Sequence, residues 1–510
     1  MTVVQAVDGT EVLPNHVYVI PPGKDLTALD GHLRLNPLGV ERGKRVVVDL
    51  FFRSLADTHG PHAAAIILSG ADGDGALGIK RIKERGGLTI AQDMDEAEHP
   101  SMPRTAIETG MVDWVMRVRD IPQKLVAYMK QEHVLKLPPE EGPQPAQPVK
   151  ASHNQAETAL REVLVFLRTR TGRDFSYYKR ATILRRIARR MQVNGVDDLP
   201  GYLSYLRRHP GESGALLQDL LISVTNFFRD RDAFEAVEKL IPQLFEGKSQ
   251  SDSVRVWCPA CATGEEAYSM AMLLLEHART LDTPPSLQVF ACDLDEEAIA
   301  KARAGHFPGA MVADVSEERV KKFFTKEHGG YRVRRELREM VLFAAHDLLK
   351  DAPFSRMDLI SCRNLLIYLN RPAQKRVFDT LHFALKPGGL LFLGTSENID
   401  DGTPLFRVID KKNRIYAQQP TNRVGLPVPT GSSVLLRAID ACADHGPVFH
   451  GRRFEQQSAT PFPAAPGPLA LDRSALAEFT SSCSNASRRH RSSSMPSMTS
   501  CISRKVPGAF

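Results

Sequence analysis

The stretch that most constrains the fold is residues 254–271, which read VRVWCPACATGEEAYSMA. A β-branched and aromatic run leads to a proline and small residues, then to Gly264 and two acids, and finally to an alanine- and methionine-rich helical pattern. This order predicts a strand, a turn and a helix. Such a junction in a parallel sheet is a common ligand site, where the carboxylate of Glu265 can accept hydrogen bonds from an amine or a hydroxyl. An ordinary turn whose acid is favoured by the helix dipole would give the same pattern.

Polar residues also follow later strands. The segments VFACDLDEEAIAKARAG, VLFAAHDLL and MDLISCRNLLIYL each predict a strand that ends at a polar residue, and LKPGGLLFLGTSENI predicts a fifth strand. The polar residues at the four strand ends are Glu265, Asp293, Asp347 and Asn364. A single acid there would be typical of a helix cap, whereas four in phase favour one shared pocket at the carboxyl edge of a sheet. The sequence therefore predicts an α/β fold with a Rossmann-like, doubly wound sheet.

The expected ligand of this pocket is a nucleoside without phosphates. No G-x-x-x-x-G-K-[ST] stretch occurs, and the first turn lacks the three glycines that cradle a pyrophosphate. An acid after the second strand, here Asp293, is the usual partner of ribose hydroxyls. S-adenosylmethionine meets these requirements, so we expect it as the cofactor.

The WCPAC stretch allows a rival interpretation, because a strand leading to W-C-x-x-C at a helix start is typical of thioredoxin-like redox sites. The acids at the later strand ends would serve no purpose in thiol exchange, and a single C-x-x-C lacks the second pair of a structural zinc site. We therefore expect Cys258 and Cys261 to be small buried residues. The seven cysteines are irregularly spaced, which fits a reducing compartment rather than a disulfide framework.

Length and charge limit the classes of function. A chain of 510 residues predicts about two to four domains. The net charge is only +6, so any basic function must be local. No stretch approaches about 18 apolar residues, and the N-terminus has acids where a signal peptide has a basic and then an apolar run. We expect a cytoplasmic protein without membrane insertion.

The first 133 residues alternate short strands and helices. The buried run AAAIIL ends in SGADGDGALG, which predicts a tight turn that presents Asp74 at the end of a strand. D-x-D-G also occurs in calcium loops, but no bidentate glutamate or third acid follows at the required spacing, so we expect no metal. Residues 134–155 are rich in Pro and Gln and predict a linker, since they cannot build a core.

Residues 156–232 predict a small all-helical domain. One of its helices has apolar residues at helical spacing and a strongly positive remainder without an acid, which includes Arg185, Arg186, Arg189 and Arg190. Three interpretations of these arginines are open: a solvated face, a nucleic-acid surface, or a surface that attracts an acidic protein. No interleaved aromatic platform or zinc-ligand spacing supports nucleic acid.

Several N-terminal segments resemble the C-terminal part of the chemotaxis receptor methylesterase (CheB) domain: VYVIPPGKDL, VDLFFRSLA, IILSGADGDGALG, GGLTIAQD and SMPRTAIETGMVDWV. In that family the aspartate that matches Asp74 orients a histidine, which activates a serine nucleophile. The segments that carry this serine and histidine in the family would lie before residue 1. The resemblance therefore implies a partial domain with Asp74 as a residual triad member, and we expect no esterase activity from this polypeptide.

A second set of segments resembles the chemotaxis receptor glutamate methyltransferase (CheR) family over residues 155–420: SVTNFFRD, WCPACATGEEAYSMA, FACDLDEEAI, FAAHDLL, CRNLLIYL and LKPGGLLFLGTSENI. The resemblance implies methyl transfer from S-adenosylmethionine to glutamates on a receptor's helical bundle. It also implies a small β-subdomain at about 305–345, and Ser223 stands where many members have asparagine. The implied cofactor site is Thr225, Arg229, Glu265, Asp293, Asp347, Leu348, Arg363 and Asn364, with Asp293 at the ribose and the Asp347 segment at the adenine.

This chemistry needs little acid or base catalysis, because the acceptor glutamate is already ionised at neutral pH. Catalysis should be alignment of the reacting atoms with water excluded. We expect Arg229 and Arg363 to hold carboxylates and Tyr368 to orient groups near the methyl, with helix packing as the alternative role of Tyr368. The resemblance favours an acidic protein as the partner of the basic helix, with Arg185, Arg186, Arg189 and Arg190 binding the receptor.

The expected organisation is a partial methylesterase-like domain at 1–133, a linker at 134–155, a helical domain at 156–232, a methyltransferase domain at 233–420 and a disordered tail at 421–510. The expected function is protein-glutamate O-methyltransferase. Two alternatives remain: a receptor-docking adaptor that does not bind the cofactor, and a methyltransferase with another carboxylate acceptor.

Overall fold

The structure is a computed structural model that describes residues 1–37, 46–132, 134–140, 151–221, 224–327, 330–399 and 404–421. The described ranges do not include Ser223, residues 328–329 or the expected tail beyond Thr421. Within these ranges, no helix is both long and apolar enough to cross a membrane.

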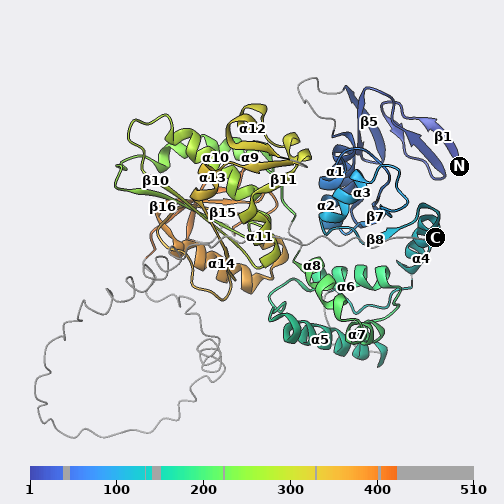
Figure 1. The fold of residues 1–510 in the computed structure, drawn as a ribbon. Helices are drawn as coiled ribbons and strands as arrows, with labels where there is room; N and C mark the ends of the chain where they lie inside the picture. The colour runs from blue at the N-terminus through green and yellow to red at the C-terminus, as the bar shows by residue number, and fades with distance from the viewer. Residues whose placement is uncertain are drawn as a thin grey trace, which may run out of the picture. The chain divides into compact units, whose positions relative to one another are not determined.

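The N-terminal segment combines a β-rich portion with a small α/β portion (Figure 1). Strands β6, β7 and β8 form a parallel sheet, β4 lies antiparallel to β5, which also pairs with β2, and β1 pairs with β3. The bounds are β1 Thr2–Gln5, β2 Thr10–Glu11, β3 His16–Val19, β4 Lys24–Leu29, β5 His32–Pro37, α1 Val47–His59, β6 Ala64–Ile67, α2 Ala76–Glu84, β7 Leu88–Gln92, α3 Ser101–Glu108, β8 Trp114–Met116 and α4 Ile121–Glu132.

Four helices follow, as the sequence predicts: α5 Ala151–Thr171, α6 Arg180–Asn194, α7 Leu199–Arg208 and α8 Pro210–Leu220. Their apolar faces form one core, because residues three or four apart lie on the same side of a helix. On α6 this face consists of Ile183, Leu184, Ile187 and Met191. Helix α5 begins within the expected linker.

A seven-stranded mixed sheet forms the centre of the C-terminal half, in the order β14-β10-β9-β15-β16-β18-β17. The pairings from β14 to β16 are parallel, and β18 runs antiparallel to both β16 and β17. This confirms the predicted Rossmann-like sheet and adds an antiparallel edge. The bounds are α9 Arg231–Glu238, β9 Ser253–Pro259, α10 Glu265–Ala278, β10 Ser286–Asp293, α11 Glu296–Ala304, β14 Val341–Ala345, β15 Met357–Cys362, α14 Arg371–Ala384, β16 Leu385–Leu393, β17 Phe406–Asp410 and β18 Ile415–Gln418.

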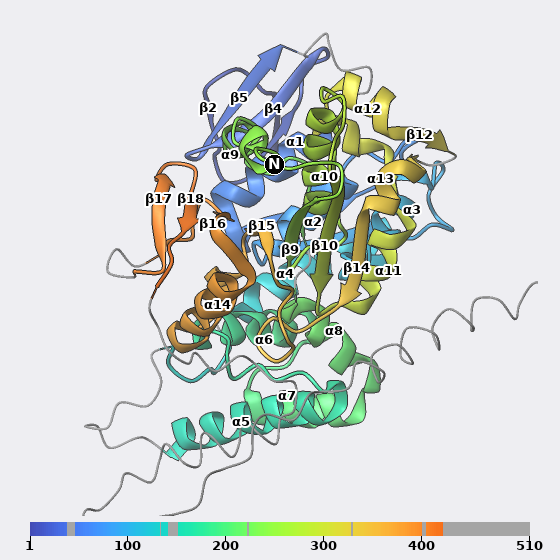
Figure 2. The ribbon, with the colours of Figure 1, turned by 90° about the vertical axis from the view of Figure 1, so that its left-hand side faces the viewer.

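Helices cover both faces of this sheet, as Figure 2 shows for α10 and α14. Successive strand residues point to opposite faces. Val256 of β9 therefore packs in the core that contains α10, whereas the next residue, Trp257, packs in the core that contains α14. A small sheet of β11 His306–Pro308, β13 Gly330–Val333 and β12 Phe324–Glu327 lies between α11 and β14 in the chain, with α12 Glu317–Phe323 and α13 Arg335–Met340.

The strand order places a ligand crevice between β9 and β15. The chain moves outward from β9 to β10 and β14, and then returns to β15 on the other side of β9. The connections after β9 and β15 therefore leave toward opposite faces, and this reversal opens a crevice at the carboxyl ends of the strands.

Candidate active site

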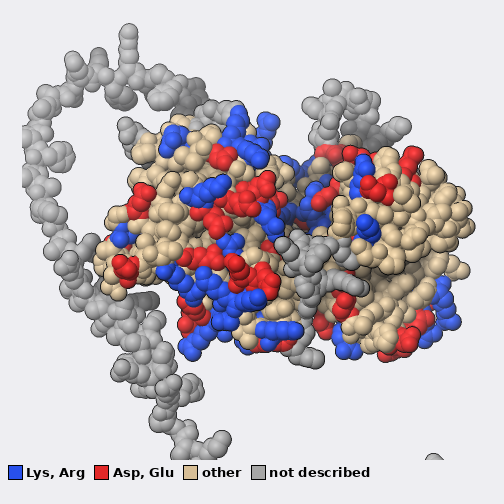
Figure 3. Space-filling model, turned by 90° about the horizontal axis from the view of Figure 1, so that it is seen from above, with Lys and Arg blue, Asp and Glu red and all other residues tan. Residues whose placement is uncertain are grey.

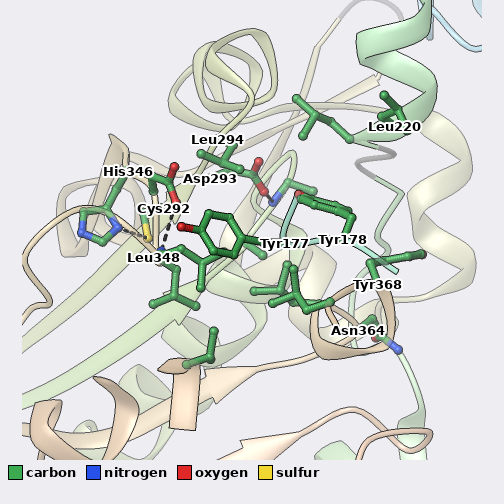
Figure 4. Close-up of a pocket in the computed structure, with 18 of the residues that line it drawn as sticks. Tyr177, Tyr178, Leu220, Cys292, Asp293, Leu294, His346, Leu348, Asn364 and Tyr368 are labelled. Atoms are coloured by element: carbon green, nitrogen blue, oxygen red, sulfur yellow. Dashed lines mark hydrogen bonds between the residues drawn. The ribbon is translucent and has the colours of Figure 1, made fainter. Parts of the chain in front are cut away.

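A pocket lies at these carboxyl ends. Its volume is about 1250 Å³, which includes space open to solvent. Most of the expected cofactor residues line it: Thr225, Arg229, Asp293, Asp347, Leu348, Arg363 and Asn364. Tyr368 lines it as well. Figure 4 shows that Tyr177 and Tyr178, from the loop between α5 and α6, project into the same space as Asp293 and Tyr368.

Asp293, the last residue of β10, ties together the turns that follow β9 and β10. Its Oδ2 accepts a hydrogen bond from Ala262 N at 2.8 Å, and its Oδ1 accepts one from Asp295 N at 2.9 Å. Burial raises the pKa of Asp293 to about 6. Each oxygen keeps a second lone pair, so the carboxylate can still accept from a ligand hydroxyl.

Left-handed backbone is concentrated at this pocket. Ala260, Ala262 and Asn364 line it with φ of 56°, 49° and 59°. Phe228 and Asp230, on either side of Arg229, have φ of 48° and 60°. Such conformations cost about 1 kcal/mol or more for residues with a Cβ, and they persist where the surroundings impose them, often at functional sites. The strain thus marks the loops that carry the pocket residues.

Arg363, directly after β15, has a fully buried side chain. Its Nη2 donates to Arg229 O at 2.9 Å and to Asp230 Oδ2 at 2.7 Å. Its Nη1 lies 3.6 Å from Glu266 Oε2, and neither Nη1 nor Nε makes a hydrogen bond among the described residues. A buried guanidinium with free N–H groups in a pocket is suited to receive a ligand carboxylate.

The two neighbouring acids at the start of α10 face different cavities. Glu266 lines the pocket, accepts from Ser361 Oγ at 2.6 Å and has its pKa raised by burial. Glu265 does not line it. It lines a second cavity and accepts from Thr263 Oγ1 at 2.6 Å. Sequence reasoning chose Glu265 and missed Glu266, although the GEE motif offered both.

Asn364 is held in place by Glu397, which the sequence analysis did not single out. The Asn364 N–H donates to Glu397 Oε2 at 2.9 Å, and the Leu366 N–H donates to Oε1 at 2.7 Å. Burial raises the pKa of Glu397, while backbone N–H groups such as that of Gly394 oppose this. The carboxylate therefore closes the loop that leads from Asn364 toward Tyr368.

Arg229 and Tyr368, the expected positioning residues, both border the pocket. Arg229 Nη1 donates to Val224 O at 3.0 Å, and Nη2 donates to Glu84 Oε1 at 3.1 Å. Burial, together with the charge of Glu84, raises the pKa of Tyr368. Its phenol therefore remains a neutral hydrogen-bond donor over a wide pH range.

The four arginines of α6 that were expected to bind a receptor do not form one exposed surface. Arg185 is exposed, whereas Arg186, Arg189 and Arg190 are buried. Arg190 pairs with Glu212 at 2.6 Å, and Arg186 and Arg189 donate to backbone carbonyls of the N-terminal segment. On the face shown in Figure 3, basic and acidic side chains are intermixed. In this conformation only Arg185 of the four is placed to meet a partner.

Asp74, the expected residual triad member, serves the N-terminus of α1. Its Oδ2 accepts from Val48 N at 3.0 Å and its Oδ1 from Asp49 N at 2.9 Å. It lines the second cavity, away from the pocket. The cysteines of WCPAC, Cys258 and Cys261, are free and buried, and burial raises the pKa of both thiols, which disfavours the reactive thiolate.

Known families match most of the chain. Residues 223–415 match the CheR methyltransferase, SAM binding domain, residues 158–221 match the CheR methyltransferase, all-alpha domain, and residues 1–125 match the CheB methylesterase family. A chemotaxis protein methyltransferase of Escherichia coli (strain K12) is 33% identical over 255 residues, which cover 48% of this chain and 85% of that protein. The chain belongs to the CheR methyltransferase family.

Other CheR relatives and a longer protein give the extent of the similarity. Chemotaxis protein methyltransferase 2 of Vibrio cholerae is 30% identical, over 47% of this chain and 85% of that one. An uncharacterized 104.1 kDa protein of Rhodobacter capsulatus is 37% identical over 82% of this chain. The matched part covers only 45% of that protein, so this chain spans less than half of its length. The crystal structure of the Thermotoga maritima CheB methylesterase catalytic domain shows 32% identity and a TM-score of 0.23, covering 24% of this chain and 67% of that one.

A CheR SAM-binding domain implies S-adenosylmethionine, and the pocket residues fit this cofactor. Asp293 stands at the end of the second strand, where ribose hydroxyls are received. Arg363 has buried N–H groups that make no hydrogen bond among the described residues and can donate to a carboxylate. Leu348, Tyr177 and Tyr178 give apolar surface for a planar base. The protein is therefore a methyltransferase that uses S-adenosylmethionine.

Proposed function

We propose that this protein transfers a methyl group from S-adenosylmethionine to glutamate side chains on the acidic helical bundle of a chemotaxis receptor, in the cytoplasm. The observation that supports this most is the pairing of a nucleoside-type pocket with Arg229 and Tyr368 at one border. A guanidinium binds a carboxylate acceptor through two N–H groups, and this explains why a carboxylate rather than an amine would be the substrate.

S-adenosylmethionine, when bound, supplies an electrophilic methyl on a sulfonium. In this proposal Asp293 receives the ribose, the Asp347–Leu348 segment holds the adenine, and Arg363 holds the carboxylate of the cofactor's amino acid. Thr225 and Asn364 complete the cofactor site. Arg229 and Tyr368 orient the acceptor carboxylate, and Tyr177 and Tyr178 exclude water. No general base is needed, since a glutamate is ionised at neutral pH.

Two measurements test this proposal. Calorimetry with S-adenosylhomocysteine should show binding that Asp293→Ala abolishes and that Asp282→Ala, a change at an exposed site, leaves intact. Labelled methyl transfer to receptor fragments should be base-labile, as expected of a glutamyl ester. Failure to bind would favour the receptor-docking adaptor. Binding with transfer only to other carboxylates would favour the alternative acceptor.

We also propose that this polypeptide has no esterase activity. Both Asp74 oxygens accept N–H groups of α1, so its visible role is structural. A methylated receptor fragment incubated with the protein should release methanol no faster than with Asp74→Asn. Hydrolysis that depends on Asp74 would overturn this part.

A further inference from the structure

A glutamate of the N-terminal segment reaches the methyltransferase pocket. Glu84, the last residue of α2, lines the pocket and is only 9% exposed. Its Oε1 accepts from Arg229 Nη2 at 3.1 Å, and its Oε2 accepts from Arg81 Nη1 at 2.6 Å. The side chain thus presents its carboxylate to the arginine that our proposed function assigns to the acceptor.

Contacts from α6 fix the chain at this position. Arg186 donates to the carbonyls of Lys83 and Glu84 at 3.2 and 2.6 Å, and Arg189 donates to the carbonyl of Gly87 at 3.2 and 3.0 Å. The last carbonyls of a helix lack partners within it and carry its negative partial charge. The arginine N–H groups donate hydrogen bonds to these carbonyls, and the positive charge of the arginines offsets the negative partial charge. The end of α2 is therefore held against α6.

Buried ion pairs also hold the N-terminal segment against α6 and α8. We call Lys83, Asp113, Arg189 and Asp219 the interdomain charge cluster. Lys83 Nζ lies 2.9 Å from Asp113 Oδ1 and 3.2 Å from Asp219 Oδ1, while Arg189 pairs with Asp219 at 2.6 Å and also with Asp113. Burial opposes ionisation, but Arg189 and Lys83 hold the pKa of Asp113 at about 2. The cluster keeps Glu84 at the pocket.

We propose that Glu84 occupies the position of the acceptor glutamate, so that the N-terminal segment competes with the receptor for Arg229. This rests on the proposed function. The reasoning is chemical: Glu84 has the same side chain as the substrate, and its charge also acts on Tyr368. An external glutamate can pair with Arg229 Nη2 only after Glu84 has left.

The test uses the full chain and poly-L-glutamate as an acidic probe, with binding followed by fluorescence anisotropy. Glu84→Gln keeps the shape of the side chain and removes its charge. We expect it to bind the probe about tenfold more tightly than the unaltered chain, which is the size of one charge-assisted hydrogen bond. The matched control Glu98→Gln, at an exposed site of the same segment, should bind like the unaltered chain.

The same comparison in an Arg229→Ala variant tests whether the probe binds at Arg229. In Arg229→Ala, adding Glu84→Gln should give no gain, because the shared partner is absent. An equal affinity with and without Glu84→Gln, or a gain that persists in Arg229→Ala, would overturn the inference. S-adenosylhomocysteine affinity is measured in parallel. If it is absent in the unaltered chain, the proposed function fails by itself, independently of the result with Glu84.

Discussion

The Arg363 guanidinium makes fewer hydrogen bonds than it can donate, because its Nε and Nη1 have no hydrogen-bond partner among the described residues. Its guanidinium lies 4.6 Å from the ring centroid of Phe392 and 5.0 Å from that of Phe234, which gives it cation-π stabilisation. Its nearest buried anion is Glu266. Removing the cation alone would leave that carboxylate buried with the Ser361 hydroxyl as its remaining hydrogen-bond partner and, among the described residues, no adjacent positive charge to pair with.

We therefore predict that Arg363→Met lowers the free energy of unfolding by about 3 to 5 kcal/mol, the cost of breaking a buried pair. Adding Glu266→Gln should restore most of this stability, since the stranded charge is then gone. Urea denaturation at pH 7 measures both effects. A loss in the single variant that the second change does not reduce would contradict this account.

The raised pKa of Asp293 predicts a pH-dependent affinity. Its folded value of about 6 exceeds the ordinary 3.8, so between these values the folded chain binds more protons than the unfolded chain, and Asp293 makes folding less favourable as pH rises. Hydroxyl binding requires the ionised form. Affinity for S-adenosylhomocysteine should therefore fall below about pH 6, by up to about tenfold per pH unit. Calorimetry from about pH 5 to 8 should show this fall in the unaltered chain and not in Asp293→Asn.

At the scale of elements, the start of α10 depends on Gly264. Its φ is +92°, and an added Cβ would lie 2.9 Å from Ala302 Cβ and 3.0 Å from the ring of Phe343. Both contacts come from packed elements of the sheet domain that have little room to move.

Gly264→Ala should therefore lower the free energy of unfolding by about 1 to 3 kcal/mol and weaken cofactor binding, because the start of α10 would shift away from α11 and β14. Thermal unfolding and calorimetry measure the two effects. Gly388→Ala is a matched control: it has a φ of +76° but nothing within 4 Å of the added Cβ, so it isolates the backbone strain from the clash. Equal losses in both variants would contradict a steric cause.

The same elements show how far sequence reasoning reaches. The strand ends were predictable, because apolar runs and the residues that follow them encode strand, edge and face. Choosing between Glu265 and Glu266 was not, since neighbouring helical residues point about 100° apart and the exact start of α10 decides which faces the pocket. The site also includes Tyr177, Tyr178 and Glu397. These residues reach it through contacts between segments that are far apart in the chain, and a local sequence pattern cannot predict such contacts.

For the whole molecule, the interdomain charge cluster joins the N-terminal and helical segments. Breaking one buried ion pair is costly, whereas exposed pairs contribute little. The arginines of α6 look like an exposed basic face in the sequence, because the acids that neutralise them are as distant as Asp113 and Glu212.

We predict that Asp219→Asn lowers the free energy of unfolding by roughly 3 kcal/mol and separates the N-terminal transition from that of the rest in scanning calorimetry. Glu162→Gln, which removes the exposed pair with Arg207, should change it by less than about 1 kcal/mol. A single, unshifted transition in Asp219→Asn would contradict a coupling role for the cluster.

The inward-facing arginines of α6 have a consequence for fragments of this protein that lack the N-terminal segment. Removing the N-terminal segment by a cut between residues 141 and 150 would take away the carbonyls that accept from Arg186 and Arg189. It would also remove Asp113, so that Arg189 would keep only Asp219 as its acidic partner and both guanidiniums would become more exposed. The liberated transferase fragment should therefore bind polyanions such as heparin more tightly than the parent does. Activities measured on such a fragment would describe a differently charged molecule.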